Sequence, residues 1–193
     1  MNRKIVKIVL GIVIGMMLVC LVAGVATFAL AGSVARALAS ELQSDPTQVA
    51  AVASGIADYD LPAGFGNAYA TQVAGFSFVT YIGDDRRSHI YLFQLPAYII
   101  LDRAELERQA QQATQPRSPN RPPRMETVDR RQAIVRSQEI TLTVREGVNS
   151  DGLAYREMSG IFQGKGGQAL VTITGLIKTW DQAKVDAFLA SIR

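Results

Sequence analysis

The first constraint on this chain is an uncharged, apolar run near its N-terminus. Residues 8–32 contain no Asp, Glu, Lys or Arg. As a helix rising about 1.5 Å per residue, this run is longer than the roughly 30 Å hydrocarbon core of a bilayer. The run therefore predicts one tilted transmembrane helix that leaves the rest of the chain on one side of a membrane.

The charges beside the run indicate its orientation. Arg3, Lys4 and Lys7 precede it, and the next basic residue is Arg36. Because positive flanks stay in the cytoplasm, we expect a cytoplasmic N-terminus and an extracytoplasmic C-terminal domain at the cell membrane. The same three residues account for the net charge of +3, since 17 basic and 17 acidic residues remain. A neutral domain does not favour nucleic acid as a partner.

Two kinds of processing compete with an uncleaved signal anchor. Ala29-Leu30-Ala31 resembles a signal-peptidase site, but the apolar run exceeds the roughly 7–15 residues of a signal core. Cys20 could carry a lipid, yet Met17-Leu18-Val19 lacks the small residue usual before a lipidated cysteine. We expect the anchor to remain, and Gly11 and Gly15 form a GxxxG pattern that could pair two such helices.

The cysteine and histidine counts exclude several kinds of site. The single cysteine, Cys20, lies inside the apolar run, so the remaining chain has no disulfide and no cysteine nucleophile. The single histidine, His89, excludes zinc sites built from His and Cys. We therefore expect neither a metal nor a cofactor.

The composition divides the chain into four parts. These are, in order, a basic flank at 1–7, the transmembrane helix at 8–32, juxtamembrane helices at 33–57 and an α+β domain at 58–193. The second juxtamembrane helix is expected over 46–56, because Asp45 suits an N-cap and Pro46 suits the first helical position.

Alternation of apolar and polar residues predicts the strands of the domain. They are expected at 76–82, 89–95, 133–145, 153–163 and 169–178, the first two forming a hairpin. A further helix is expected over 102–113, followed by a Pro/Arg-rich loop at 114–124. The final helix begins with the capping box Thr179–Gln182, and its apolar stripe consists of Val185, Phe188, Leu189 and Ile192.

This order of elements predicts an α+β fold, an antiparallel sheet flanked by helices. Residues 61–65 (LPAGF) lead into the sheet, and residues 180–192 (WDQAKVDAFLASI) close the domain. With these motifs the chain resembles the PsbP-like α/β/α sandwich domains, as in membrane-anchored extracytoplasmic bacterial proteins of unassigned function. The resemblance covers about residues 55–193 and carries over no catalytic residue, and the loop at 114–124 departs from a compact sandwich.

Two motif-like segments are better explained as turns. Residues 160–166 (GIFQGKG) place three residues instead of four before Gly-Lys, and they lack the Ser or Thr of a phosphate loop. Asp58, Asp60, Asp84 and Asp85 lack the spacing of a calcium loop, and aspartate is common in turns and caps.

An arginine cluster is the strongest candidate for a binding site. Its members are Arg117, Arg121, Arg124, Arg130, Arg131 and Arg136. Glu126 and Asp129 are the acidic residues within the same span. Because arginine suits bidentate contact with phosphate or carboxylate, we expect an anionic lipid or an acidic protein partner. A proline-rich segment can also dock in an aromatic groove, and the alternative to binding is a solvated insertion.

The sequence thus favours a single-pass, membrane-anchored extracytoplasmic domain with a binding or supporting role. The alternative is a membrane-tethered hydrolase that uses His89 with Ser77 or Tyr81 and an acid such as Glu157. That chemistry requires these groups to converge in one pocket, within hydrogen-bond reach of each other.

Overall fold

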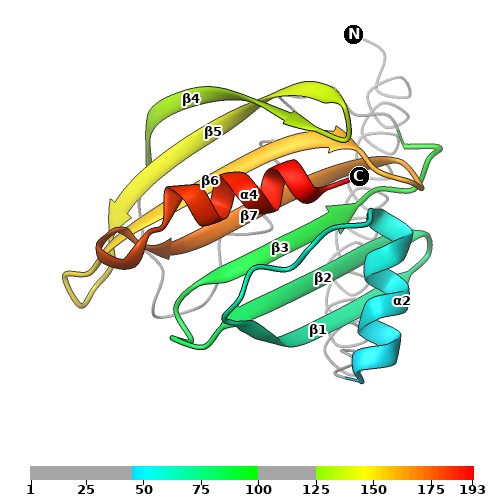
Figure 1. Ribbon diagram of the computed structural model, residues 1–193, viewed down its shortest axis with the longest axis horizontal. Coiled ribbons are helices and arrows are strands. Elements are labelled where there is room, and N and C mark those ends of the chain that lie inside the picture. Colours follow the sequence, from blue (N-terminus) through cyan, green and yellow to red (C-terminus); the bar gives the residue numbers. More distant parts are fainter. Residues whose placement is uncertain (1–44, 100–124) are drawn as a thin grey trace, which may run out of the picture. The chain divides into compact units, whose positions relative to one another are not determined.

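The computed structural model describes residues 45–99 and 125–193. Within them, seven strands form one antiparallel sheet in the order β1-β2-β3-β7-β6-β5-β4 (Figure 1). The strands are β1 (Phe65–Val73), β2 (Phe76–Gly83), β3 (His89–Gln94), β4 (Glu126–Val135), β5 (Gln138–Val148), β6 (Ala154–Gln163) and β7 (Gln168–Leu176). The α+β prediction is confirmed. The expected transmembrane helix, the helix at 102–113 and the loop at 114–124 lie outside the described residues.

The described helices are α2 (Pro46–Ile56), the short 3₁₀ helix η1 (Ile177–Thr179) and α4 (Gln182–Ser191). None of them is long and apolar enough to cross a bilayer. The Asp45 carboxylate caps α2 by accepting hydrogen bonds from the N–H groups of Thr47 and Gln48 at 2.8 and 3.2 Å, as predicted. The predicted cap of α4 is wrong by two residues, because Asp181 accepts from the Lys184 N–H while Thr179 belongs to η1.

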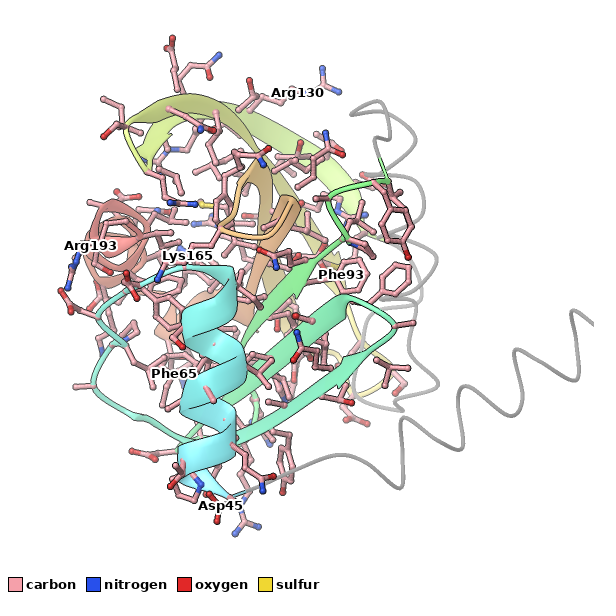
Figure 2. All side chains as sticks on the ribbon, turned by 90° about the vertical axis from the view of Figure 1, so that its right-hand side faces the viewer. Asp45, Phe65, Phe93, Arg130, Lys165 and Arg193 are labelled. Carbon is pink, nitrogen blue, oxygen red and sulfur yellow. The ribbon has the colours of Figure 1, made fainter. Side chains whose placement is uncertain are left out.

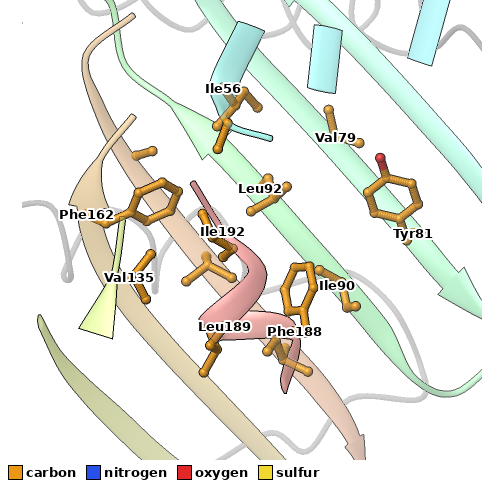
Figure 3. Close-up of a cluster of buried hydrophobic side chains, with 14 of the residues drawn as sticks. Ile56, Val79, Tyr81, Ile90, Leu92, Val135, Phe162, Phe188, Leu189 and Ile192 are labelled. Carbon is orange, nitrogen blue, oxygen red and sulfur yellow. The ribbon is translucent and has the colours of Figure 1, made fainter. Parts of the chain in front are cut away.

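Both α helices pack on the same face of the sheet, which we call the helix face (Figures 1 and 3). The predicted stripe of α4 is buried there, and so are Val49, Ala53 and Ile56 of α2. Alternate strand residues complete the core, among them Ala70, Val79, Leu92, Leu142, Met158 and Val171. Because successive side chains of a strand point to opposite faces, the remaining alternate residues form what we call the second face.

Two strand predictions fail. Residues 133–145 are not one strand, because the chain reverses at Arg136 and Ser137 to form the β4–β5 hairpin. Both turn residues have positive φ, 51° and 60°, which a two-residue hairpin requires but which Asn or Gly usually supplies. The strand β1 was also missed, since its Gly, Asn and Ala residues are weak strand formers.

The C-terminal residues join two distant parts of the domain. The Arg193 N–H donates to the Asp58 carbonyl at 2.8 Å, and the Asp58 N–H donates to the Arg193 carbonyl at 3.0 Å. One residue earlier, the Ile192 carbonyl accepts from the Arg136 N–H at 3.0 Å. The end of α4 is therefore fixed between the segment before β1 and the β4–β5 turn.

The GIFQGKG segment forms the turn between β6 and β7, as expected. The Gly166 N–H donates to the buried side chain of Gln94 at 3.0 Å, and the Lys165 N–H donates to the Ile56 carbonyl at 2.8 Å. Gly167 has φ of 153°, and a Cβ there would overlap the carbonyl oxygen of Leu95. The β6–β7 turn is therefore bonded to both β3 and α2. At position 167 of this turn only glycine fits.

We predict that Gly167→Ala lowers the free energy of unfolding by about 2–4 kcal/mol, because both the backbone conformation and the Leu95 carbonyl oppose a side chain. Urea unfolding of the chain in detergent, followed by the fluorescence of the single tryptophan, Trp180, measures the effect. Gly55→Ala is the control: nothing lies within 4 Å of its added Cβ, so this helical site should gain about 0.5–1 kcal/mol. Equal effects of the two substitutions would contradict the prediction.

Candidate functional site

Strand β4 is one outer edge of the described sheet. Its alternate residues separate into two environments. Arg131 and Ala133 lie on the helix face beside α4 and are half-buried, whereas Arg130, Gln132 and Ile134 lie on the second face and are exposed. The side chain of Ile134 is large and apolar, and the residue is 69% exposed. This edge thus presents a cation, an amide and an apolar group in one row.

The hairpin also determines which backbone groups of β4 point outward. The pair that flanks a two-residue turn is hydrogen-bonded, and bonded and non-bonded pairs alternate from there. Val135 and Gln138 form that flanking pair. Arg130, Gln132 and Ile134 therefore occupy non-bonded positions, and their N–H and C=O groups point away from β5.

The structure separates the arginines of the predicted cluster. Arg131 contacts Asp186 of α4 at 3.3 Å, and Arg136 donates to the carbonyl of Gln163 at 2.9 Å, so both stabilise the domain. Arg130 projects outward from β4 without a side-chain partner among the described residues (Figure 2). Arg117, Arg121 and Arg124 lie outside the described residues. Arg130 is therefore the described member of the cluster that is available to a ligand.

The centre of the second face holds a buried ion pair. Arg145 of β5 is directly opposite Glu157 of β6 and contacts its carboxylate. Glu157 is 1% exposed, and the Arg145 Nε has no hydrogen-bond partner among the described residues. Leu170 and Thr172 on the same face are 6% and 3% exposed. Sequence reasoning did not single out Arg145, because neither spacing nor alternation marks a cross-strand pair.

The structure does not bring together the groups of the hydrolase alternative. His89 lies on the second face, where burial lowers its pKa, and it stacks on Tyr91. Ser77 and Tyr81 are buried on the helix face, and the Tyr81 hydroxyl is 2.7 Å from that of Tyr59. Burial raises the pKa of Tyr81.

Glu157 shares the second face with His89, but β7 lies between their strands. Two strand spacings correspond to roughly 10 Å, beyond hydrogen-bond reach. The geometry therefore assembles no nucleophile, base and acid from these four residues.

A hollow of about 210 Å³ lies at the end of the sheet where α4 begins. Phe65, Ile173 and Trp180 form its apolar part, and Asp84, Asp85 and Asp181 contribute carboxylates. Its volume is below the roughly 300–1,000 Å³ of typical ligand sites. Asp85 is already bonded to the N–H groups of Arg87 and Ser88, and Asp181 caps α4. These contacts account for the two carboxylates as turn and cap residues.

The other singled-out aspartates and Lys165 also make structural contacts. Asp58 pairs with Lys165 at 2.7 Å, and Asp60 pairs with Arg193 at 3.2 Å. Over residues 45–99 and 125–193, no three His, Cys, Asp or Glu side chains gather as metal ligands would. The edge of β4 remains as a described feature that presents an exposed charged, an amide and an apolar side chain in one row.

Comparisons with known proteins assign no family. No family model matches the chain, and a search of curated proteins finds no significant match. Over residues 45–99 and 125–193, the structure establishes a seven-stranded antiparallel sheet with two α helices packed on it.

We predict that Glu157→Gln lowers the free energy of unfolding by about 3–5 kcal/mol, because it leaves the Arg145 charge buried without its counter-ion. Urea unfolding in detergent, followed by Trp180 fluorescence, measures the loss. The double variant Arg145→Met with Glu157→Leu is the control, and it should recover most of that stability because no charge is left buried. A loss below about 1 kcal/mol for Glu157→Gln would show that water screens the pair.

Proposed function

We propose that this chain is a single-pass membrane protein whose extracytoplasmic domain binds an acidic partner through the outer edge of β4. The uncharged run at 8–32 and the basic residues before it support the anchor and its orientation. The observation that carries the binding role is Arg130, exposed on an edge strand whose preceding segment, 114–124, contains three more arginines.

The backbone edge of β4 favours a protein partner over the lipid of the anchoring membrane. Gln132 and Ile134 direct N–H and C=O groups away from β5. A partner strand pairs with both kinds of group in register, whereas a lipid headgroup offers no regular row of donors and acceptors.

We further propose that the domain is a PsbP-like α/β/α sandwich, in which the helix predicted at 102–113 covers the second face.

Burial on the second face supports the same arrangement. Leu170, Thr172 and Glu157 are almost fully buried, although both described α helices pack on the other face. The predicted helix at 102–113 offers an apolar stripe that includes Leu106 and Ala110. Arg130, Gln132 and Ile134 are exposed, so the proposed cover does not extend over β4.

The anchor is tested by carbonate extraction of membranes that contain the full chain. We expect the chain to stay in the membrane pellet, and Leu18→Arg combined with Leu21→Arg to release much of it. Each arginine at the centre of a span costs about 2.5–3.5 kcal/mol. Leu42→Arg, outside the run, is the matched control and should change nothing. Quantitative release of the wild-type chain would exclude the anchor.

The cover is tested by stability. Leu106→Asp should lower the free energy of unfolding by at least about 2–3 kcal/mol, because it removes an apolar side chain from the proposed interface. Ala104→Asp, on the opposite side of the predicted helix, should have little effect, since acidic residues suit a first helical turn. Urea unfolding followed by Trp180 fluorescence compares the two variants. Equal stability of both would contradict the cover.

A further inference from the structure

We propose that the acidic partner binds as an extended segment that adds an eighth strand to the sheet along β4. This inference rests on the proposed function and specifies its site and its mode. In this binding mode, main-chain hydrogen bonds provide the affinity and side-chain contacts provide the specificity for the partner.

The first support is the set of outward backbone groups on β4. Arg130, Gln132 and Ile134 are in non-hydrogen-bonded pairs with β5, so each directs an N–H and a C=O away from the sheet. The Arg130 N–H is already donated to the Asp129 carboxylate at 2.7 Å, so the donors offered to a partner are those of Gln132 and Ile134. From Asp129 to Val135 the register with β5 is unbroken, because the irregularity lies earlier, between Thr127 and Asp129. A partner strand therefore meets a regular row of donors and acceptors.

The opposite edge of the sheet lacks this arrangement. In the β1–β2 hairpin, Val73 and Phe76 flank a two-residue turn, so Ala68, Ala70 and Gln72 direct their backbone groups outward. These residues lie on the helix face, and Ala70 is fully buried where α2 packs on β1. The helix thus covers one of the two sides of β1 onto which an added strand would place alternate side chains, whereas the second-face side of β4 is exposed.

Side chains indicate the chemistry of the partner. Arg130, Gln132 and Ile134 follow at every second position on one face. Side chains directly opposite on a paired strand interact, and opposite charges stabilise while like charges destabilise. An acidic residue therefore suits the position opposite Arg130, and an apolar one suits the position opposite Ile134.

The charge of the neighbouring chain also disfavours a second copy as the occupant. Six arginines and two acidic residues fall between Arg117 and Arg136. Pairing two β4 strands would bring two such basic segments together, at a cost in repulsion. A strand from an acidic protein gains from the same charges.

Binding is tested with the full chain in phosphatidylcholine nanodiscs and a fluorescein-labelled peptide whose alternate positions carry glutamate, threonine and valine in turn, with threonine between them. Fluorescence anisotropy should show this peptide binding at least tenfold more tightly than its lysine counterpart. Arg130→Glu should weaken binding at least tenfold. N-methylation of alternate peptide residues, which blocks one edge of the peptide strand, should have an equal effect.

The decisive variant is Gln132→Pro, which removes one outward N–H and leaves the backbone bonds between β4 and β5 intact. It also removes the hydrogen bond from the Thr141 hydroxyl to the Gln132 side chain, and the control Gln132→Ala removes the same bond. We expect at least a tenfold loss of binding for Gln132→Pro with an unfolding midpoint equal to that of Gln132→Ala, whereas Gln132→Ala should bind within twofold of the wild type. Amide hydrogen exchange gives a second measurement that needs no variant. The glutamate peptide should slow exchange at Gln132 and Ile134 at least tenfold, but not at Arg131 or Ala133.

Three results would overturn the proposal. They are equal binding of the lysine peptide, binding that survives Gln132→Pro in a folded chain, and a chain dimer that Gln132→Pro dissociates, which would identify a second copy as the occupant. Carbonate extraction of the same chain tests the anchor independently of the peptide experiment. Release of the chain from the membrane would exclude the anchored function but would leave the result of peptide binding at β4 unaffected.

Discussion

The structure depends on burial at one face of the sheet. Phe188, Leu189 and Ile192 of α4 and Ile56 of α2 meet alternate apolar residues from all seven described strands in a single cluster. Burying each such side chain contributes about 1.5–3 kcal/mol, so this cluster is the largest favourable contribution available to the domain. The hydrogen bonds of Arg193 and Ile192 then hold the end of α4 in place over the sheet.

Because one face takes the apolar residues, the other can be polar without disrupting the core. The second face carries Arg145 and Glu157 at its centre and aromatic residues toward β2 and β3, where Phe78 stacks on Tyr91. A buried ion pair of this kind contributes little net stability but makes other arrangements of the strands costly, since misregistered pairing would leave a charge alone. We regard it as a determinant of register between β5 and β6.

Local sequence signals predicted the helix 46–56, the final helix apart from a start two residues too early, and the hairpin of β2 and β3, because caps, apolar stripes and alternation all act over a few residues. They failed at Arg136 and Ser137, where tertiary contacts hold two non-glycine residues at positive φ. This error also hid the edge of β4, since a strand running through 133–145 has no turn from which to determine which residues point outward. The separation of His89 from Ser77 and Tyr81 follows from strand alternation and could have been foreseen, whereas the pairing of β3 with β7 could not, because it joins residues about eighty positions apart.

The two-residue turn at Arg136 and Ser137 determines which side of the sheet each β4 side chain occupies. A single-residue insertion or deletion there would shift each β4 side chain to the opposite side of the sheet, turning Arg130 inward and Arg131 outward. An insertion or deletion in this hairpin would therefore change which β4 side chains are exposed to solvent, while the amino-acid composition and hydrophobic content of the domain stay almost the same.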